Sequence, residues 1–248
     1  MDESLSGDSS RSRTIRRCGL IVLLSGLAAC GGGGASSSAN NTGGTGTTIS
    51  SVSPAGIVVA ATPATVSLTG NNFAAGMTIA MSSSLGTTRI TPTSVTSTSM
   101  VVSVPVSTLP SGNYVTLSVM PASGGAALAS AILGVAGTAR TLAADIQAIF
   151  DNAGCTSCHA GAVPSGGLDL TGGSSAAALI NRNSVGCATR FRVTPGDPRR
   201  SSSVLVDKIQ ARSSGVAACS GNPMPPPGST LGAQDIQAII DWVAGGAN

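Results

Sequence analysis

Residues 155–161 read CTSCHAG, and this stretch contains the only histidine among the 248 residues of the chain. Cys155 and Cys158 occupy both positions of a Cys-x-x-Cys pair directly before His159. In a chain with six cysteines, that coincidence would arise about once in 1,700 sequences of this length. The spacing therefore indicates a site that needs two thiols and one imidazole side by side.

An apolar helical pattern lies on each side of this motif. TLAADIQAIFDNAG, with Thr141 as the expected N-cap, predicts a helix that runs straight into Cys155. STLGAQDIQAIIDWVAGGAN predicts a last helix with a cap near Ser229 or Thr230. The apolar positions are Leu142, Ile146, Ile149, Phe150 and Ala153 in the first helix, and Ile236, Ile239, Ile240 and Val243 in the second.

Several kinds of site use two cysteines at this spacing. Thioether attachment of haem uses both thiols and places the following histidine beneath the iron. A thioredoxin-type dithiol follows a strand and opens a helix, whereas this pair closes one. A zinc site needs a fourth ligand, such as Cys187 or Cys219, and no second metal-spaced pair is present. A plain disulfide between Cys155 and Cys158 is a further alternative, and the helical setting favours haem.

The C-terminal segment resembles a class I c-type cytochrome domain. An aromatic residue stands five positions before the C-x-x-C-H motif, the closing helix carries a tryptophan, and GGLDL, TPGDPRRSSSVLVDKI and MPPPGSTL follow in the expected order. The resemblance covers residues 141–248 and implies an all-α fold with one covalent haem c. It also implies thioethers through Cys155 and Cys158, with His159 as the proximal iron ligand.

Met224 is the expected distal iron ligand. It is the sole methionine after Met120, and it lies in NPMPPPG, where the flanking prolines would stiffen the segment that presents its sulfur. Lys208, the only lysine of the chain, and an open coordination site are the alternatives. Ligation by histidine and methionine would favour the reduced iron, which suits electron transfer.

Other residues are expected to surround the haem. The Pro164 carbonyl is the predicted acceptor for the ring N–H of His159. Phe150 and Trp242 are expected to bring the first and last helices together against the haem edge. Four arginines could pair with the propionates or simply be solvated: Arg190, Arg192, Arg199 and Arg200.

The middle of the chain, residues 48–137, alternates between apolar and polar residues as half-buried strands do. Turn residues separate the runs, which predicts an all-β sandwich. ISSVSPAG, VSLTGNNF and LPSGNYVTLSV, with their I-x-x-V-x-P, L-T-G-x-x-F and P-S-G-x-Y patterns, resemble the IPT/TIG immunoglobulin-like domain. The resemblance implies a spacer or docking module, and the stretch has no His, Asp, Glu or Cys for acid–base chemistry.

The N-terminus has the pattern of an exported lipoprotein. RSRTIRRCGLIVLLSGLAAC, residues 11–30, runs from arginines through a short apolar core to small residues and a cysteine, and its end resembles a bacterial lipobox. Residues 1–29 are therefore the expected signal peptide, Cys30 the lipidation site, and residues 30–47 a flexible Gly/Ser/Thr tether. An ordinary signal peptide cut near Ala29, which would leave Cys30 as a free thiol, is the alternative. Gly31 after the cysteine favours the outer membrane.

Two cysteines remain after these assignments. Cys187 and Cys219 form an even pair in an oxidising compartment, which predicts a disulfide between them. On the chain-entropy model, such a bond would stabilise the fold by roughly 3–4 kcal/mol. Two free thiols are the alternative.

The charge pattern narrows the functional class. Residues 141–248 balance seven Lys and Arg against seven Asp, so no basic patch suggests nucleic-acid binding. A ligated His159 cannot act as a general base, and the only glutamate, Glu3, lies in the leader, so we expect no enzyme. The leading hypothesis is a membrane-tethered monohaem cytochrome that carries single electrons to an unknown redox protein of the periplasm or cell envelope. An adhesion or scaffold lipoprotein, or a haem-based sensor, is the alternative.

Overall fold

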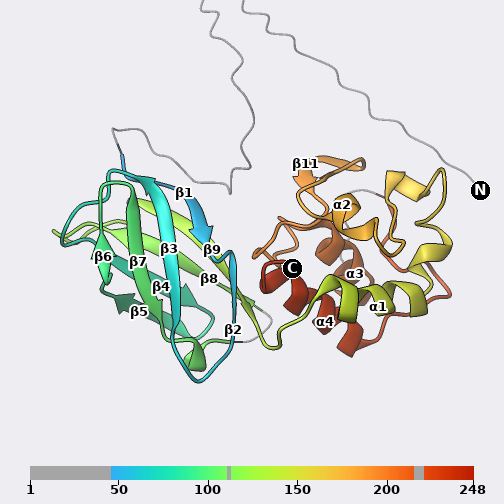
Figure 1. Cartoon of the computed structure of the whole chain (residues 1–248), viewed down its shortest axis with the longest axis horizontal. Helices are drawn as coiled ribbons and strands as arrows, with labels where there is room; N and C mark the ends of the chain where they lie inside the picture. The colour runs from blue at the N-terminus through green and yellow to red at the C-terminus, as the bar shows by residue number, and fades with distance from the viewer. Residues whose placement is uncertain (1–45, 111–112, 215–220) are drawn as a thin grey trace, which may run out of the picture. The chain divides into compact units, whose positions relative to one another are not determined.

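The computed structural model describes residues 46–110, 113–214 and 221–248. Strands occupy the part of the chain up to Ala136, and helices dominate from Leu142 onward (Figure 1). The predicted signal peptide, the lipidation site at Cys30, nearly all of the tether, and Cys219 lie outside the described residues. No helix in the described ranges is long and apolar enough to cross a membrane.

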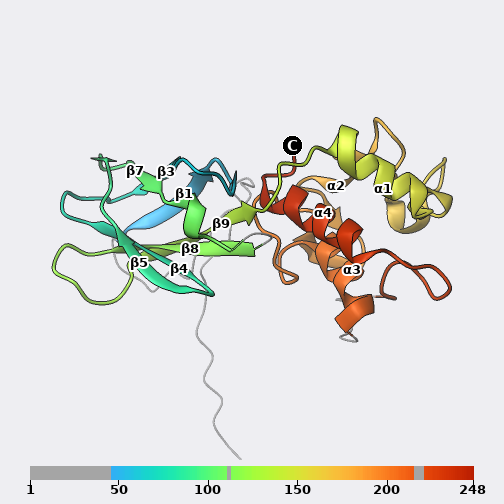
Figure 2. The ribbon, with the colours of Figure 1, turned by 90° about the horizontal axis from the view of Figure 1, so that it is seen from below.

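The first part is a sandwich of two sheets, which lie as two layers in Figure 2. Neighbouring strands are antiparallel except β2 and β9, which pair in parallel. The first sheet has the order β1 (Thr48–Ser53), β3 (Ala64–Asn71), β7 (Ser99–Val104) and β6 (Ser94–Val95). The second has the order β2 (Gly56–Val58), β9 (Ala129–Ala136), β8 (Asn113–Met120), β4 (Thr78–Ser83) and β5 (Gly86–Ile90).

Alternate side chains of these strands form the core of the sandwich, as the period-two pattern predicts. Val66 and Leu68 of β3 lie opposite Val102 and Met100 of β7, and all four are fully buried. In β8, Val115, Leu117 and Val119 are fully buried while Thr116 and Ser118 between them are half-buried on the other face. Each fully buried aliphatic side chain contributes about 1.5–3 kcal/mol, so the sandwich has a core of its own.

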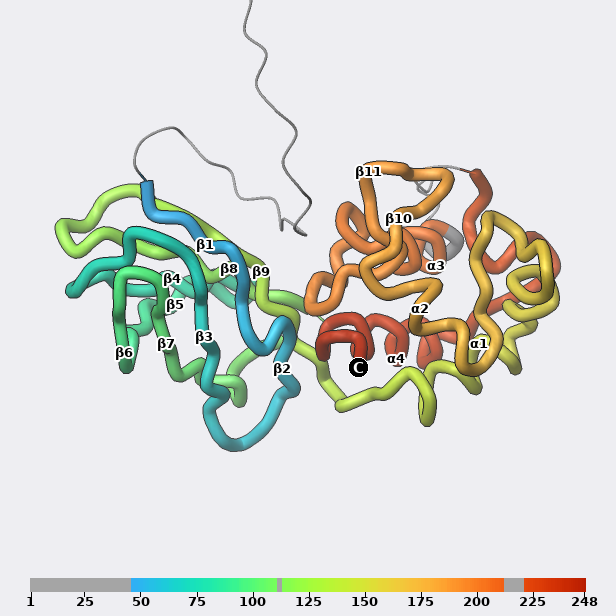
Figure 3. Tube along the Cα trace, turned by 45° about the horizontal axis from the view of Figure 1, so that its top comes forward, coloured from blue at the N-terminus to red at the C-terminus, as the bar shows by residue number. Residues whose placement is uncertain are grey.

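The second part contains the predicted helices together with elements that the sequence pattern did not indicate. A π-helical turn, Leu142–Ile146, continues into α1 (Gln147–Asn152), and α4 (Ala233–Ala244) ends the domain. Between them lie α2 (Ser175–Leu179), the strands β10 (Asn183–Ser184) and β11 (Cys187–Phe191), and α3 (Val204–Ser214). The expectation of an all-α domain over 141–248 therefore needs correction, because β10 and β11 form a small antiparallel ribbon beside α2 and α3 (Figure 3).

The two predicted helix caps have different outcomes. The Thr141 side chain accepts the Ala144 N–H at 3.2 Å, so it caps the first helix as expected. The last helix begins at Ala233 with Gly232 as its N-cap and without a side-chain cap, so the prediction near Ser229 or Thr230 is wrong. The Ser229 N–H donates to the Pro226 carbonyl in a turn, which places that residue outside the helix.

The last helix is buried on all sides from Ala238 to Ala244, although its sequence suggests a single apolar face. Trp242 is fully buried, and its indole N–H donates to the Asn248 carbonyl at 3.0 Å. The Leu142 N–H donates to that same carbonyl at 2.9 Å. Trp242 thus anchors the C-terminus to the start of the first helix.

Asp241 is buried in the same helix, and its Oδ1 accepts two hydrogen bonds. Its carboxylate accepts the Gly137 N–H at 3.0 Å and the Gln237 side-chain amide at 3.2 Å. Gly137 directly follows β9, so this hydrogen bond joins the end of the last strand to α4. A buried carboxylate without such donors would be strongly destabilising.

Truncating Phe150 or Trp242 to alanine should cost about 3–5 kcal/mol of unfolding free energy, because each side chain is almost completely buried in the helical core. Urea unfolding followed by circular dichroism at the helical band would measure this loss. Val163→Ala is the matched control, since Val163 is 93% exposed. A loss of a few tenths of a kcal/mol for Phe150→Ala, equal to that of the control, would contradict its placement in the core.

Candidate functional site

The Cys-x-x-Cys-His motif folds as a tight turn directly after α1. The helix ends at Asn152, and Gly154 has a φ of 72°, in the left-handed region that favours glycine. A 3₁₀ turn, Cys155–Ser157, follows, and the His159 N–H donates to the Cys155 carbonyl at 2.9 Å. The expected uninterrupted helix is therefore replaced by a turn that brings both thiols and the imidazole to one place.

The imidazole of His159 is held by one main-chain carbonyl. Its Nδ1 lies 2.9 Å from the Ser165 carbonyl oxygen, and because a carbonyl only accepts, Nδ1 carries the proton. The lone pair is therefore on Nε2, which is the atom left for a metal. Pro164 was the predicted acceptor, and this prediction is wrong by one residue: its carbonyl accepts the Gly167 N–H at 2.9 Å.

The loop that carries the acceptor is closed by two further hydrogen bonds. The Ser165 N–H donates to the Cys158 carbonyl at 3.0 Å, and the Leu170 N–H donates to the His159 carbonyl at 2.7 Å. We call residues 159–170 the histidine loop. Its backbone is tied to the motif at its middle, through Ser165, and at its C-terminal end, through Leu170, so the Ser165 carbonyl has a defined position.

Cys155, Cys158, His159 and Met224 line one cavity of about 590 Å³. This volume lies within the range of roughly 300–1,000 Å³ that is usual for ligand pockets. Both cysteines are free thiols. The apolar part of the wall comes from α1, the histidine loop, α2, α3 and α4, through Phe150, Leu168, Leu170, Leu179, Val204, Leu205, Ile209 and Ile239. Trp242 is not among the lining residues, so of the two predicted aromatics only Phe150 meets the cavity.

The two thiols differ in environment. Cys155 packs against the helical core, and this burial raises the pKa of its thiol, with the nearby Asp151 carboxylate raising it further. Cys158 is exposed to solvent. Ser157, between them, turns its hydroxyl back to donate to the Gly154 carbonyl at 2.6 Å. Both thiols line the cavity, and the raised pKa of Cys155 keeps its thiol protonated at neutral pH.

Lys208 holds the segment that presents Met224. The Lys208 carbonyl accepts the Met224 N–H at 3.0 Å, and its ammonium group donates to the Asn222 carbonyl at 3.1 Å. Burial lowers the pKa of Lys208, while Asp207 opposes this shift. The peptide bond between Met224 and Pro225 is cis, and Pro225 and Pro226 also line the cavity. The only lysine of the chain thus clamps the proline-rich segment at two points.

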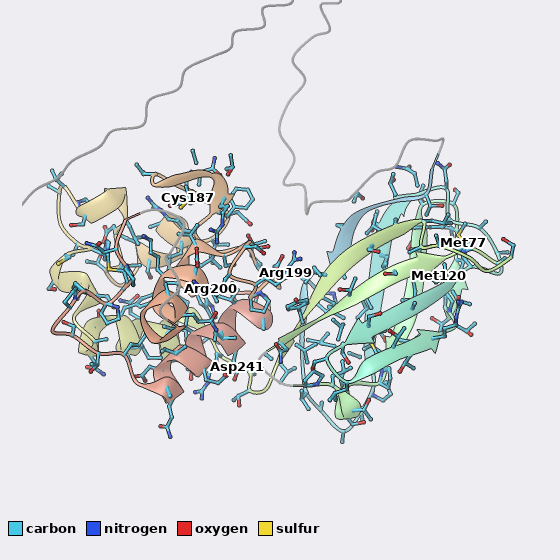
Figure 4. The ribbon with its side chains drawn as sticks, turned by 180° about the vertical axis from the view of Figure 1, so that it is seen from behind. Met77, Met120, Cys187, Arg199, Arg200 and Asp241 are labelled. Atoms are coloured by element: carbon cyan, nitrogen blue, oxygen red, sulfur yellow. The ribbon has the colours of Figure 1, made fainter. Side chains whose placement is uncertain are left out.

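Of the four arginines suggested for propionates, only Arg192 lines the cavity. Arg190 and Arg200 both pair with the buried Asp207, at 3.0 and 2.9 Å, and Arg199 pairs with Asp197 at 2.6 Å. These three ion pairs occupy the guanidinium groups on protein partners; Figure 4 labels Arg199 and Arg200. Arg190, Arg199 and Arg200 therefore do not line the cavity, and their side chains pair with aspartates instead of being simply solvated.

Cys187, which Figure 4 labels, stands at the start of β11. Its sulfur is in a disulfide bond. The three residues before it, 184–186, line the cavity, so this disulfide lies beside the wall of the site. A zinc site with a Cys187 thiolate is therefore wrong, since the sulfur is already in a covalent bond. Cys219, the expected partner, lies outside the described residues, and the pairing stays a prediction.

Comparison with known proteins identifies the sandwich. Residues 47–131 match the family model of the IPT/TIG domain, which nearly coincides with the predicted 48–137. A search of curated proteins found no match to the chain. The first part of the chain is therefore an IPT/TIG domain, and the interpretation of the second part depends on the geometry of its cavity.

Proposed function

We propose that the chain is a monohaem c-type cytochrome that carries single electrons in the cell envelope. One observation carries this proposal: two free thiols, a histidine with its lone pair on Nε2 and a methionine line the same apolar cavity. These are the donors that class I cytochromes use, in the order in which that family has them. Residues 141–248 would form the cytochrome domain.

The residues present fit haem c. Cys155 and Cys158 would hold it as thioethers, and His159 and Met224 would be its proximal and distal iron ligands. Bound there, haem c supplies a one-electron couple between ferric and ferrous iron. The Ser165 carbonyl orients the imidazole through Nδ1, and the Lys208 clamp holds the methionine segment. A largely apolar wall around the haem would disfavour the more highly charged oxidised state.

The rest of the chain would position this domain. We propose that Cys30 carries a lipid anchor, most consistent with the outer membrane on its periplasmic face or at the cell surface. The IPT/TIG domain would act as a spacer or docking module between anchor and haem. The partner would be another redox protein of the periplasm or envelope, and the chain would neither bind nucleic acid nor act as an enzyme.

One preparation tests the proposal. Protein produced with cytochrome c maturation and purified should give a spectrum with sharp bands that appear on reduction by dithionite and reverse on oxidation. The chromophore should stay with the polypeptide through acid–acetone extraction, because thioethers survive denaturation. Haem that moves into the organic phase, or an intact mass equal to that of the polypeptide alone, would reject the proposal.

A further inference from the structure

Arg192 directly follows β11 and makes three hydrogen bonds to main-chain carbonyls. Its Nη1 donates to the Ala178 oxygen at 2.8 Å, and its Nη2 donates to the Gly166 and Gly167 oxygens at 2.9 and 3.0 Å. None of these three acceptors is a carboxylate, whereas Arg190, Arg199 and Arg200 each form an ion pair with an aspartate. The positive charge of Arg192 is therefore not neutralised by these contacts.

The acceptors belong to the histidine loop. Gly166 and Gly167 have consecutive left-handed backbone conformations, with φ of 64° and 60°, which glycine adopts without steric cost. This conformation places both carbonyls within reach of the Arg192 guanidinium, whereas the carbonyl of the preceding residue, Ser165, accepts from His159 Nδ1. The first carbonyl that accepts from Arg192 thus belongs to the residue directly after the one that accepts from His159.

The surroundings of the guanidinium make its charge effective. Arg192 lines the same cavity as His159, and its side chain is half-buried. Burial lowers the pKa of Arg192, and the neighbouring Arg182 charge lowers it further, yet a guanidinium stays protonated at any physiological pH. A fixed cation in a partly buried site acts on nearby charges more strongly than one in water.

We propose that Arg192 is a positioning residue for the axial histidine and sets the redox balance of the site. It fixes the Ser165 carbonyl, and through it the plane of the His159 ring, by holding the next two peptide groups. Its uncompensated charge also favours the reduced state, which carries one positive charge less. The inference rests on the proposed function, because it concerns His159 as an iron ligand.

Two substitutions separate the charge of Arg192 from its hydrogen-bond geometry. Arg192→Gln removes the charge but keeps an amide donor, and Arg192→Lys keeps the charge but loses the planar fork. Arg182→Gln is the matched control: Arg182 lies nearby and donates to the Ala177 carbonyl, but its side chain is not hydrogen-bonded to the histidine loop and does not line the cavity. The measurements are the reduction potential, by spectroelectrochemical titration, and the exchange rate of the His159 Nδ1 proton, by NMR of the reduced protein.

Arg192→Gln should lower the reduction potential. At the potential where the wild type is half reduced, the ratio of reduced to oxidised protein should fall about tenfold, which is about 59 mV for one electron. The reduction potential of Arg192→Lys should lie between those of the wild type and Arg192→Gln, and that of Arg182→Gln should match the wild type. Exchange of the His159 Nδ1 proton should become faster in both Arg192 variants, and this effect is not expected if Arg192 only stabilises the fold.

Equal potentials for Arg192→Gln and Arg182→Gln, or an unchanged Nδ1 exchange rate in both Arg192 variants, would overturn the inference. If Arg192→Gln does not accumulate, Arg192→Lys decides by its exchange rate alone. The wild type distinguishes the two failures. Wild-type protein without covalent haem rejects the proposed function, whereas normal haem attachment with unchanged potentials rejects only the role of Arg192.

Discussion

Replacing both Cys155 and Cys158 with alanine should abolish covalent haem, and either single replacement should leave little holoprotein. Each thiol would supply one of the two thioethers that hold haem c, and no other free thiol lines the cavity in the described part of the chain. Haem staining after denaturing electrophoresis, together with the intact mass, measures the outcome. The stain should fall at least about tenfold in each single variant, because only one of the two thioethers can then form.

Ser157→Ala is the matched control for these variants. Ser157 lies between the two cysteines on the same turn, and its hydroxyl bonds only to the Gly154 carbonyl and weakly to the Cys158 sulfur. This variant should therefore keep its haem. Undiminished staining in the double cysteine variant would show that haem is not held by thioethers. A haem-free wild type whose mass is lower by two hydrogens beyond those lost in the Cys187 disulfide would instead indicate a disulfide between Cys155 and Cys158.

Replacing Met224 with alanine should open the distal side of the iron. Among the residues that the structure describes, Met224 is the only methionine that lines the cavity, so the ferric variant should lose the weak long-wavelength band of sulfur–iron ligation. Its affinity for added cyanide or imidazole should rise about tenfold or more, since no internal ligand then competes for the iron. Spectrophotometric titration of wild type and variant measures both effects.

Met120→Ala is the control, because Met120 lies at the end of β8 in the sandwich. Figure 4 labels it together with Met77, which directly precedes the paired strand β4. It should leave the spectrum unchanged. If Met224→Ala also leaves the spectrum unchanged, another group binds the iron, and adding Lys208→Ala would show whether it is the lysine. Tight cyanide binding to the wild type itself would favour a sensor over an electron carrier.

Much of the fold follows from local sequence patterns. The alternation in β3, β7 and β8 predicts which side chains enter the sandwich core, because successive residues of a strand point to opposite faces. The Thr141 cap and the apolar positions Leu142, Ile146 and Phe150 follow from the helical period in the same way. The donor set of Cys155, Cys158 and His159 also lies within five residues. In each case, residues that act together are close in the sequence.

The contacts that complete the site could not be predicted in this way. The identity of the histidine acceptor depends on a 3₁₀ turn that shifts the available carbonyl from Pro164 to Ser165. Trp242 bonds to the C-terminus instead of meeting the cavity, and the far side of α4 is buried because α4 also packs against β9. Local patterns in one sequence cannot predict these contacts, because each partner is placed by the fold of another part of the chain.

By itself, the sequence determined which residues the proposed chemistry would use and which faces of the strands and helices are apolar, because those properties depend on a few neighbouring positions. Only the tertiary structure decided how the site is supported. Arg192 and Lys208 read in the sequence as a possible propionate partner and a possible iron ligand. In the fold, they hold the histidine loop and the Met224 segment. Their carbonyl acceptors are 14 to 26 residues away, so only the folded chain brings donor and acceptor together.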